Sequence, residues 1–238
     1  MTYDHVVPRQ PARLPGLGVI TREALAFARQ ATLLHRDWTA RAPDAVLAGE
    51  DVVVVLHGLF ATAGVLRPIR KLIEARAPAT TAAFTYAPGP GVHELGTRLG
   101  QFVSAIEADV RIHLLGHSLG GVVARWYVQE LGGDPRVVQS ISLGSPFNGT
   151  RRARLMPGAV GRDILPGSEV LSRLRDGAAG GVPHLSVAAR EDTMVTEQAV
   201  FHHGERALVQ GCGHNGLLYD ERVAGLVVRR IRESRRWM

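Results

Sequence analysis

The stretch Gly-His-Ser-Leu-Gly at residues 116–120 follows an apolar run at 112–115 and opens a helical pattern. A serine with a glycine two residues away on each side, at a turn from strand to helix, has the layout of a nucleophile elbow. The turn is so tight that side chains at Gly116 and Gly120 would collide with neighbouring backbone. We therefore expect the hydroxyl of Ser118 to stand exposed at the amino end of a helix, where backbone N–H groups favour a developing negative charge.

Strand and helix patterns alternate on both sides of this turn. Residues 52–56 read Val-Val-Val-Val-Leu, a β-branched run without polar alternation, which is typical of a strand buried on both faces of a parallel sheet. The alternation implies right-handed crossovers and an α/β fold with a doubly wound, mostly parallel sheet of about six strands. We predict strands at 52–56, 81–86, 111–115, 137–143, 184–189 and 206–209, and helices at 21–35, 66–75, 91–108, 121–131, 168–175 and 217–234.

The length of 238 residues fits one domain of ordinary α/β size. We expect residues 1–50 to form an N-terminal leader and a helix, capped by Thr21, that packs on the main body at 51–238. The interval 147–183 holds several glycines and prolines and no strand pattern. An insertion of that size beside the elbow predicts a small cap or lid.

The composition is that of a globular protein, with 45% hydrophobic residues and a formal net charge of +6. We interpret the arginines at 229–236 as the solvated face of a last helix, because no nucleic-acid motif accompanies them. We therefore expect no nucleic-acid partner. A basic patch of this kind allows a weak association with a membrane surface. The single cysteine, Cys212, excludes an internal disulfide. We see no signal peptide or membrane span and expect a cytoplasmic protein, with an oligomeric state that the sequence leaves open.

A serine hydroxyl becomes a nucleophile when a base lies within hydrogen-bond reach and a third group orients that base. Two loops at the ends of later predicted strands offer these groups. His214, framed by glycines between a strand and a helix, is our candidate general base. Asp192 is the candidate orienting acid, and Glu191 is the alternative. The order serine, acid, histidine along the chain supports this selection.

An oxyanion hole needs two N–H donors, and the amide of Leu119, directly after the serine, is one of them. The second is expected after the first buried strand, where Gly58 lets the backbone turn the amide of Leu59 toward the site. We interpret His57 as a residue that braces this loop.

Apolar residues near these loops are candidates for the wall of a substrate pocket. The pocket candidates are Phe60, Phe147, Leu155 and Met156.

Adjacent histidines at 202–203 point apart on any regular element, so we expect no metal and no other cofactor. We interpret Cys212 as a small apolar residue that fills space in the core.

Several segments together resemble the α/β-hydrolase superfamily, and more narrowly the small bacterial triacylglycerol lipases and esterases related to the GPI-inositol deacylases. The segments are 57–59, 86–89, 116–121 and 143–150, together with Asp192, Val195 and His214. The segment Gly-Ser-Pro-Phe-Asn-Gly-Thr at 144–150 resembles a Gly-Thr-Pro-His-x-Gly segment of lipases, with Phe147 where histidine is common. The resemblance does not include residues 1–50.

The resemblance implies hydrolysis of a carboxylic ester through an acyl-enzyme on Ser118, with a small-molecule or lipid ester as substrate. Acyl transfer to an alcohol other than water, on the same scaffold, is an alternative. A protein that binds a lipid or a partner without catalysis is the other alternative. The acyl chain length and the alcohol of the substrate remain open.

Overall fold

The computed structural model describes residues 15–43, 49–106, 109–177, 180–196 and 200–235. Its strands form one parallel sheet of six in the order β2-β1-β3-β4-β5-β6, which confirms the predicted α/β fold. The strands are β1 (Asp51–Leu56), β2 (Ala79–Phe84), β3 (Arg111–His117), β4 (Val137–Leu143), β5 (His184–Ala189) and β6 (Glu205–Val209).

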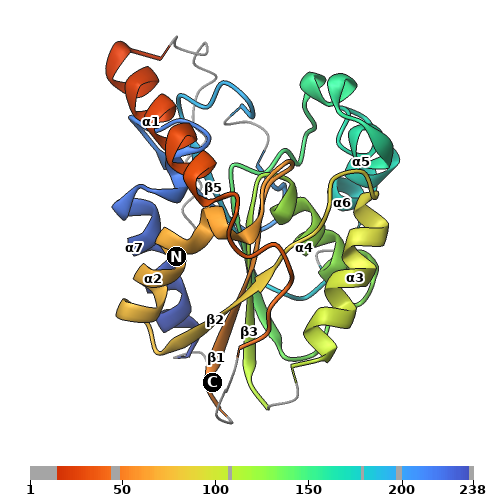
Figure 1. Ribbon diagram of the computed structural model, residues 1–238. Coiled ribbons are helices and arrows are strands. Elements are labelled where there is room, and N and C mark those ends of the chain that lie inside the picture. The colour runs from red at the N-terminus through yellow and green to blue at the C-terminus, as the bar shows by residue number, and fades with distance from the viewer. Residues whose placement is uncertain (1–14, 44–48, 107–108, 178–179, 197–199, 236–238) are drawn as a thin grey trace.

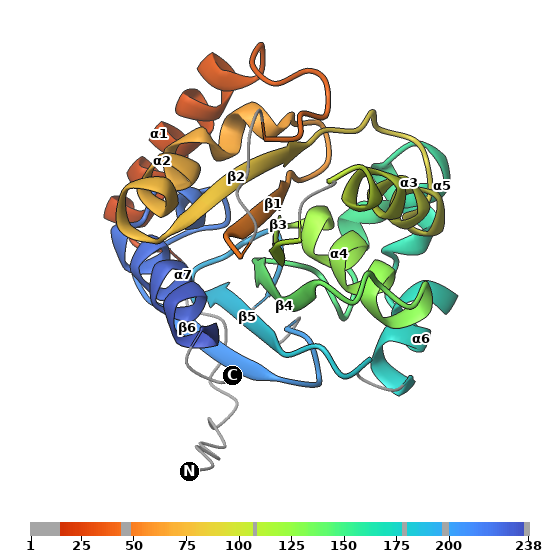
Figure 2. The same cartoon turned by 90° about the horizontal axis from the view of Figure 1, so that it is seen from below.

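Helices cover both faces of this sheet (Figures 1 and 2). One face carries α1 (Leu17–Leu33), α2 (Arg67–Arg76) and α7 (Glu221–Ser234), and the other carries α3 (Val92–Ser104), α4 (Leu119–Glu130), α5 (Gly158–Asp163) and α6 (Glu169–Asp176). Short 3-10 turns complete the set: η1 (Ala63–Leu66), η2 (Arg151–Leu155) and η4 (Gly216–Leu218). Of the helices among the described residues, none combines the length and the apolar character that crossing a membrane requires.

Each face of the sheet has its own hydrophobic core because strands of a doubly wound sheet are buried on both sides. In β1 every residue is buried: Val52, Val54 and Leu56 pack into the cluster under α3 and α4, and Val53 and Val55 into the cluster under α2 and α7. The unbroken apolar run that predicted this strand is therefore explained by burial on alternating faces.

The first helix differs from its prediction at the amino end. It begins at Leu17, with Gly16 as the N-cap residue, and Thr21 lies inside it, where the Thr21 hydroxyl donates to the carbonyl of Leu17 at 2.9 Å. The expected cap at Thr21 is wrong, because a threonine hydroxyl can bond the preceding turn of a helix as readily as it caps one. Of the leader predicted at 1–18, residues 1–14 lie outside the described residues, and Leu17 and Gly18 belong to α1.

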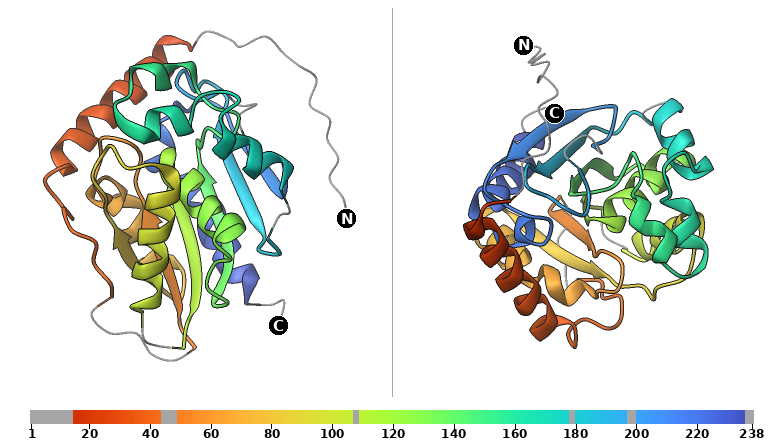
Figure 3. Two further views of the ribbon diagram at one scale, coloured as in Figure 1. Left: turned by 90° about the vertical axis from the view of Figure 1, so that its right-hand side faces the viewer. Right: turned by 90° about the horizontal axis from the view of Figure 1, so that it is seen from above.

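The strands end at one edge of the sheet, which Figure 3 shows from above. At this edge α1 lies on one side, and η2, α5 and α6 lie on the other (Figures 1 and 3). The latter three elements fall within 147–183, the segment for which we predict a cap. Because ligands of doubly wound sheets bind outside the carboxyl ends of the strands, this edge is the place to look for a site.

Candidate active site

Ser118 lies at the turn between β3 and α4 in a strained backbone conformation. Its φ is 52° and its ψ is −120°, a region that residues with a side chain rarely adopt. A Cβ added at Gly116 would overlap the backbone of Gly120 and Gly121, and one at Gly120 would lie 2.5 Å from the carbonyl oxygen of Leu56. The predicted reason for both glycines is confirmed. Ser118 itself is half-buried, between buried neighbours on each side.

His214 and Asp192 come from two different strand ends and meet at the same edge. Asp192 follows β5 and His214 follows β6, and His214 Nδ1 donates to Asp192 Oδ2 at 2.7 Å. The other carboxylate oxygen, Asp192 Oδ1, accepts the amides of Met194 and Val195, both at 2.7 Å. Both side chains are almost completely buried, so the pair is shielded from water. Such a carboxylate fixes the imidazole and leaves its Nε2 free to act as a base.

Glu191 has a different role from its neighbour. Glu191 Oε2 accepts the amides of Gly211 at 2.8 Å and Cys212 at 3.3 Å, in the loop before His214. Of these two adjacent carboxylates, Asp192 bonds the ring of His214 and Glu191 bonds backbone amides of the loop that leads to it. Of the two acids considered from the sequence, Asp192 is the one that reaches the imidazole.

His117 links the elbow to the loop at 211–218 that carries His214, which we call the histidine loop. Its ring centroid lies 4.8 Å from that of His214, and His117 Nε2 donates to the carbonyl of His214 at 3.3 Å. Burial, together with the neighbouring His214, lowers the pKa of His117 to about 3, so that it is neutral at physiological pH. Since Ser118 is the next residue in the chain, the structure brings Ser118, Asp192 and His214 to one edge of the sheet.

The two predicted oxyanion donors flank the serine. Leu119 is the first residue of α4. On the other side, a Cβ added at Gly58 would lie 3.2 Å from the Cβ of Ser118, so the loop that leads to Leu59 passes directly against the serine. A side chain at this position would be in tight contact with Ser118 and with the ring of His117.

His57 braces that loop from within. Its Nε2 accepts the amide of Tyr86 at 3.1 Å, its carbonyl accepts the Tyr86 hydroxyl at 2.5 Å, and its ring stacks on the Tyr86 ring at 4.1 Å. Burial lowers the pKa of His57 to about 4, so the imidazole is neutral and can accept the amide. These contacts tie both the ring and the carbonyl of His57 to Tyr86.

The predicted pocket residues divide into exposed and buried ones. Phe60 is 59% exposed and Leu155 is 89% exposed, whereas Met156 packs partly buried against the core. Phe147 is only 2% exposed, and its ring packs against Phe201 and His184 with centroid distances of 5.0 and 5.5 Å. We therefore reassign Phe147 from the pocket wall to the core, because its ring faces the interior of the molecule.

The sequence reasoning missed the contacts of two residues, His184 in the core and Glu23 beside the loop of His214. His184 is buried at the start of β5, and its ring nitrogens bond the hydroxyls of Ser140, Ser142 and Ser186 at 2.8 to 3.1 Å. Glu23 of α1 accepts hydrogen bonds from Asn215 and Gly216, directly after His214. The seven-residue spacing of Glu23 and Gln30, with Ala26 between them, is the signal that could have placed Glu23 on the inner face of α1.

The other candidate ligands have partners of their own or are buried. His202 Nε2 bonds Asn148 Oδ1, His203 Nε2 bonds the carbonyl of Arg175, and Cys212 is buried with its pKa raised by burial to about 12. Within the described ranges, no group of three or more histidine, cysteine, aspartate or glutamate side chains has the geometry of a metal site.

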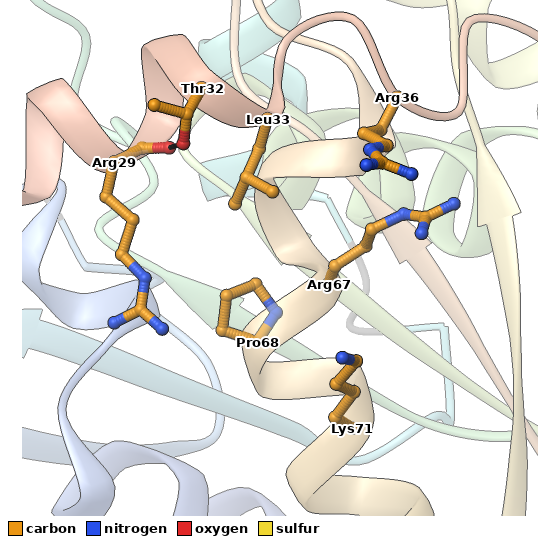
Figure 4. A pocket seen from close by; sticks show the side chains of 7 residues that line it. All are labelled: Arg29, Thr32, Leu33, Arg36, Arg67, Pro68 and Lys71. Atoms are coloured by element: carbon orange, nitrogen blue, oxygen red, sulfur yellow. Dashed lines mark hydrogen bonds between the residues drawn. The ribbon is translucent and has the colours of Figure 1, made fainter.

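A cavity of about 350 Å³ lies between α1 and the start of α2 (Figure 4). None of the candidate catalytic residues lines this cavity. Its walls combine apolar side chains with cationic ones: Arg29, Thr32, Leu33, Arg36, Arg67, Pro68 and Lys71. Arg67 is already paired with Asp37 through two hydrogen bonds of 2.9 and 2.7 Å. We assign the cavity no part in the chemistry.

One family model and several solved structures are similar to this chain. The model of the palmitoyl protein thioesterase family matches residues 52–175, which are 124 of the 238 residues of the chain. The match includes Ser118, whereas Asp192 and His214 lie beyond it. No curated protein matches the chain in sequence.

Solved structures share the fold at low sequence identity. The mature lipase BlEst2 of Bacillus licheniformis superposes with a TM-score of 0.70 at 14% identity, over 82% of this chain and 97% of that one. A monoacylglycerol lipase of Paleococcus ferrophilus gives 0.66 at 12% identity, over 79% and 97%. Lipase B of Aspergillus fumigatus gives 0.64 at 18% identity, over 82% and 56%. The fold is that of the α/β-hydrolases, as the sequence predicts.

Proposed function

The chain belongs to the palmitoyl protein thioesterase family, and on this premise we propose that it hydrolyses carboxylic acyl esters through an acyl-enzyme on Ser118. The observation that carries the proposal is the 2.7 Å hydrogen bond from His214 to Asp192 at the strand edge where the strained Ser118 stands. A nucleophile elbow alone, or a buried histidine alone, would not require a hydrogen bond between His214 and Asp192. Ser118, His214 and Asp192 together supply the nucleophile, the base and the orienting acid.

In the proposed first half-reaction, Ser118 Oγ attacks the carbonyl carbon of the ester and His214 Nε2 takes the hydroxyl proton. The Leu59 and Leu119 amides donate to the oxyanion. His214 then returns the proton to the leaving alcohol as the carbon–oxygen bond breaks. The acyl group remains on Ser118, and Asp192 holds the imidazole in the tautomer that leaves Nε2 open.

The second half-reaction repeats these steps with water. His214 takes a proton from the water as its oxygen attacks the acyl carbon, and the same proton goes to Ser118 Oγ as the acid leaves. Each proton is therefore accounted for by one imidazole. No step in the proposal requires a further cofactor.

We infer that the substrate carries an apolar acyl chain. Exposed apolar side chains, Phe60, Leu155 and Met194, follow the ends of β1, β4 and β5 at the site edge. The family is named for the hydrolysis of palmitoyl protein thioesters, so a long-chain acyl thioester is the second candidate substrate. Both reactions use the same acyl-enzyme and differ only in the leaving group.

The test is hydrolysis of p-nitrophenyl butyrate, octanoate and palmitate, and of palmitoyl-coenzyme A, by the parent and by Ser118→Ala. We expect Ser118→Ala to lose activity on the order of 10³-fold or more. Equal activity in both proteins would remove the assignment. The chain-length profile separates esterase from lipase, and added alcohols reveal acyl transfer as ester products.

We also propose weak association with an anionic lipid surface through α1. The outward side of α1 exposes Leu17 at 84%, Ile20 at 51% and Phe27 at 66%, and the same helix carries the exposed Arg22 and Arg29. A helix that carries both exposed apolar side chains and arginines suits the boundary of anionic headgroups. Phe27→Glu should lower sedimentation with phosphatidylglycerol vesicles, and Leu208→Glu on β6 should not. Equal binding of the two variants would contradict this surface.

A further inference from the structure

Glu23 lies far from the catalytic candidates in sequence and next to them in space. We propose that Glu23 is a positioning residue for His214, acting through the backbone that follows the imidazole. The inference rests on the proposed role of His214 as the base. It gives a function to the first 50 residues, which precede the part of the chain that the family model matches.

The Glu23 carboxylate accepts three hydrogen bonds from Asn215 and Gly216. Glu23 Oε1 accepts the Asn215 amide at 2.7 Å and the Asn215 side-chain Nδ2 at 2.9 Å, and Glu23 Oε2 accepts the Gly216 amide at 3.0 Å. The two amides open the turn η4, where backbone N–H groups lack partners within the turn. A carboxylate accepts such donors more strongly than a neutral group does.

Gln30 completes the contact two turns further along α1. Its Nε2 donates to Asn215 Oδ1 at 2.8 Å, so that the side chain of Asn215 is held at both ends, by Glu23 and by Gln30. Residues seven apart share a face of a helix, and the buried Ala26 lies between them on that face. The inner face of α1 therefore presents two polar side chains, Glu23 and Gln30, where it meets the histidine loop.

The glycines around His214 make room for this carboxylate. A Cβ added at Gly213 would overlap Glu23 Oε2 and lie 2.8 Å from its Cδ, and one at Gly216 would lie 3.4 Å from Oε2. A side chain at Gly213 would therefore displace the Glu23 carboxylate from its present position.

His214 is consequently fixed from both sides. Glu191 holds the amides of Gly211 and Cys212 before it, and Glu23 holds the amides of Asn215 and Gly216 after it. Removing Glu23 leaves two amides without an acceptor and frees the loop to turn. A shift of about 1 Å in a catalytic group costs roughly 100-fold in rate, so the effect should appear in turnover.

The experiment compares Glu23→Ala and Glu23→Gln with Glu94→Ala, which removes an exposed carboxylate of α3 that pairs only locally with Arg98. Active sites are titrated first, so that kcat refers to competent enzyme. We expect Glu23→Ala to lower kcat about 10- to 100-fold with KM within about twofold. Glu23→Gln should be intermediate, because its oxygen can still accept from Asn215 while its NH₂ group faces the Gly216 amide. Glu94→Ala should match the parent.

Hydrogen exchange supplies a readout that does not depend on catalysis. Amides of the loop 211–218 should exchange faster in Glu23→Ala than in the parent or Glu94→Ala. Unchanged kcat per active site, or unchanged exchange, would overturn the positioning role, and if Glu23→Ala does not fold, Glu23→Gln decides on the same criteria. Ser118→Ala is measured in the same assay to distinguish the two proposals. If Ser118→Ala still hydrolyses the ester, the proposed function fails. The hydrogen-exchange result for Glu23→Ala does not depend on that outcome.

Discussion

At the residue scale, two neighbouring carboxylates illustrate how position decides role. Asp192 bonds the ring of His214, whereas Glu191 bonds backbone amides of the loop that carries it. Only Asp192 can therefore control which imidazole nitrogen is open to the serine. A neutral amide at that position would accept less strongly and favour the wrong tautomer.

We predict that Asp192→Asn lowers kcat on the order of 10³- to 10⁴-fold while the fold is retained. The control is Asp176→Asn, which neutralises an exposed carboxylate paired with Arg175. Steady-state hydrolysis of p-nitrophenyl butyrate measures both. Asp192→Asn with parental turnover would mean that the hydrogen bond to His214 has no part in the reaction.

The sequence allowed Ser118, Asp192 and His214 to be selected together, because turn chemistry and the order of the strands restrict where such groups lie. It did not disclose Glu23, because a glutamate in an amphipathic helix ordinarily faces water. The helical spacing of Glu23 and Gln30 could place Glu23 on the inner face of α1, but local patterns do not encode its partner Asn215, more than 190 residues away. Phe147 was misplaced for the same reason: its partners Phe201 and His184 belong to later elements.

At the element scale, the elbow is where backbone approaches backbone most closely. The prediction that glycine is required follows from the atoms a side chain would meet, the backbone of α4 at Gly116 and the carbonyl of Leu56 at Gly120. Neither neighbour can move without disturbing the centre of the sheet. The strands β4 and β5 were predicted with correct limits because their apolar runs end at turn residues.

Gly120→Ala should lower the free energy of unfolding by about 3 kcal/mol or more, since the added Cβ meets fixed backbone. Gly225→Ala in α7 is the matched control. It meets open space in a helix and should raise stability by about 0.5–1 kcal/mol. Urea denaturation gives both values. A Gly120→Ala protein as stable as the parent would contradict the close packing of the elbow.

The helices were predicted less exactly than the strands. The predicted helix at 217–234 is divided into η4 and α7, because Asp220 accepts the amide of Arg222 and starts a new helix. The start of α1 was missed because Gly16 caps it with its backbone conformation and no side-chain hydrogen bond. A cap of that kind leaves no residue signature in the sequence.

At the scale of the whole molecule, buried neutral histidines link stability to pH. Burial lowers the pKa of His57 to about 4 and that of His117 to about 3, and it also lowers the pKa of His184. The unfolded chain takes up protons on these residues below about pH 6.5, whereas the folded protein does not. The free energy of unfolding should therefore fall as the pH falls from about 6.5 toward about 4.

Each such histidine contributes a slope of about 1.4 kcal/mol per pH unit in that window. His117→Gln should reduce the slope measured by urea denaturation between pH 7 and pH 5 by about that amount. The exposed His93→Gln serves as the control and should keep the parental slope. A slope that is the same in all three proteins would mean that His117 is not buried in its neutral form.

At the scale of the whole molecule, the proposed reaction depends on Ser118, at the edge of the sheet, becoming acylated. The most direct measurement is intact-mass spectrometry of the protein quenched during turnover of p-nitrophenyl palmitate, followed by peptide mapping. We predict that the parent gains one palmitoyl group on the peptide containing Ser118, and that His214→Ala acquires it far more slowly. Turnover without any acyl adduct on Ser118, or an adduct on another residue, would contradict the account.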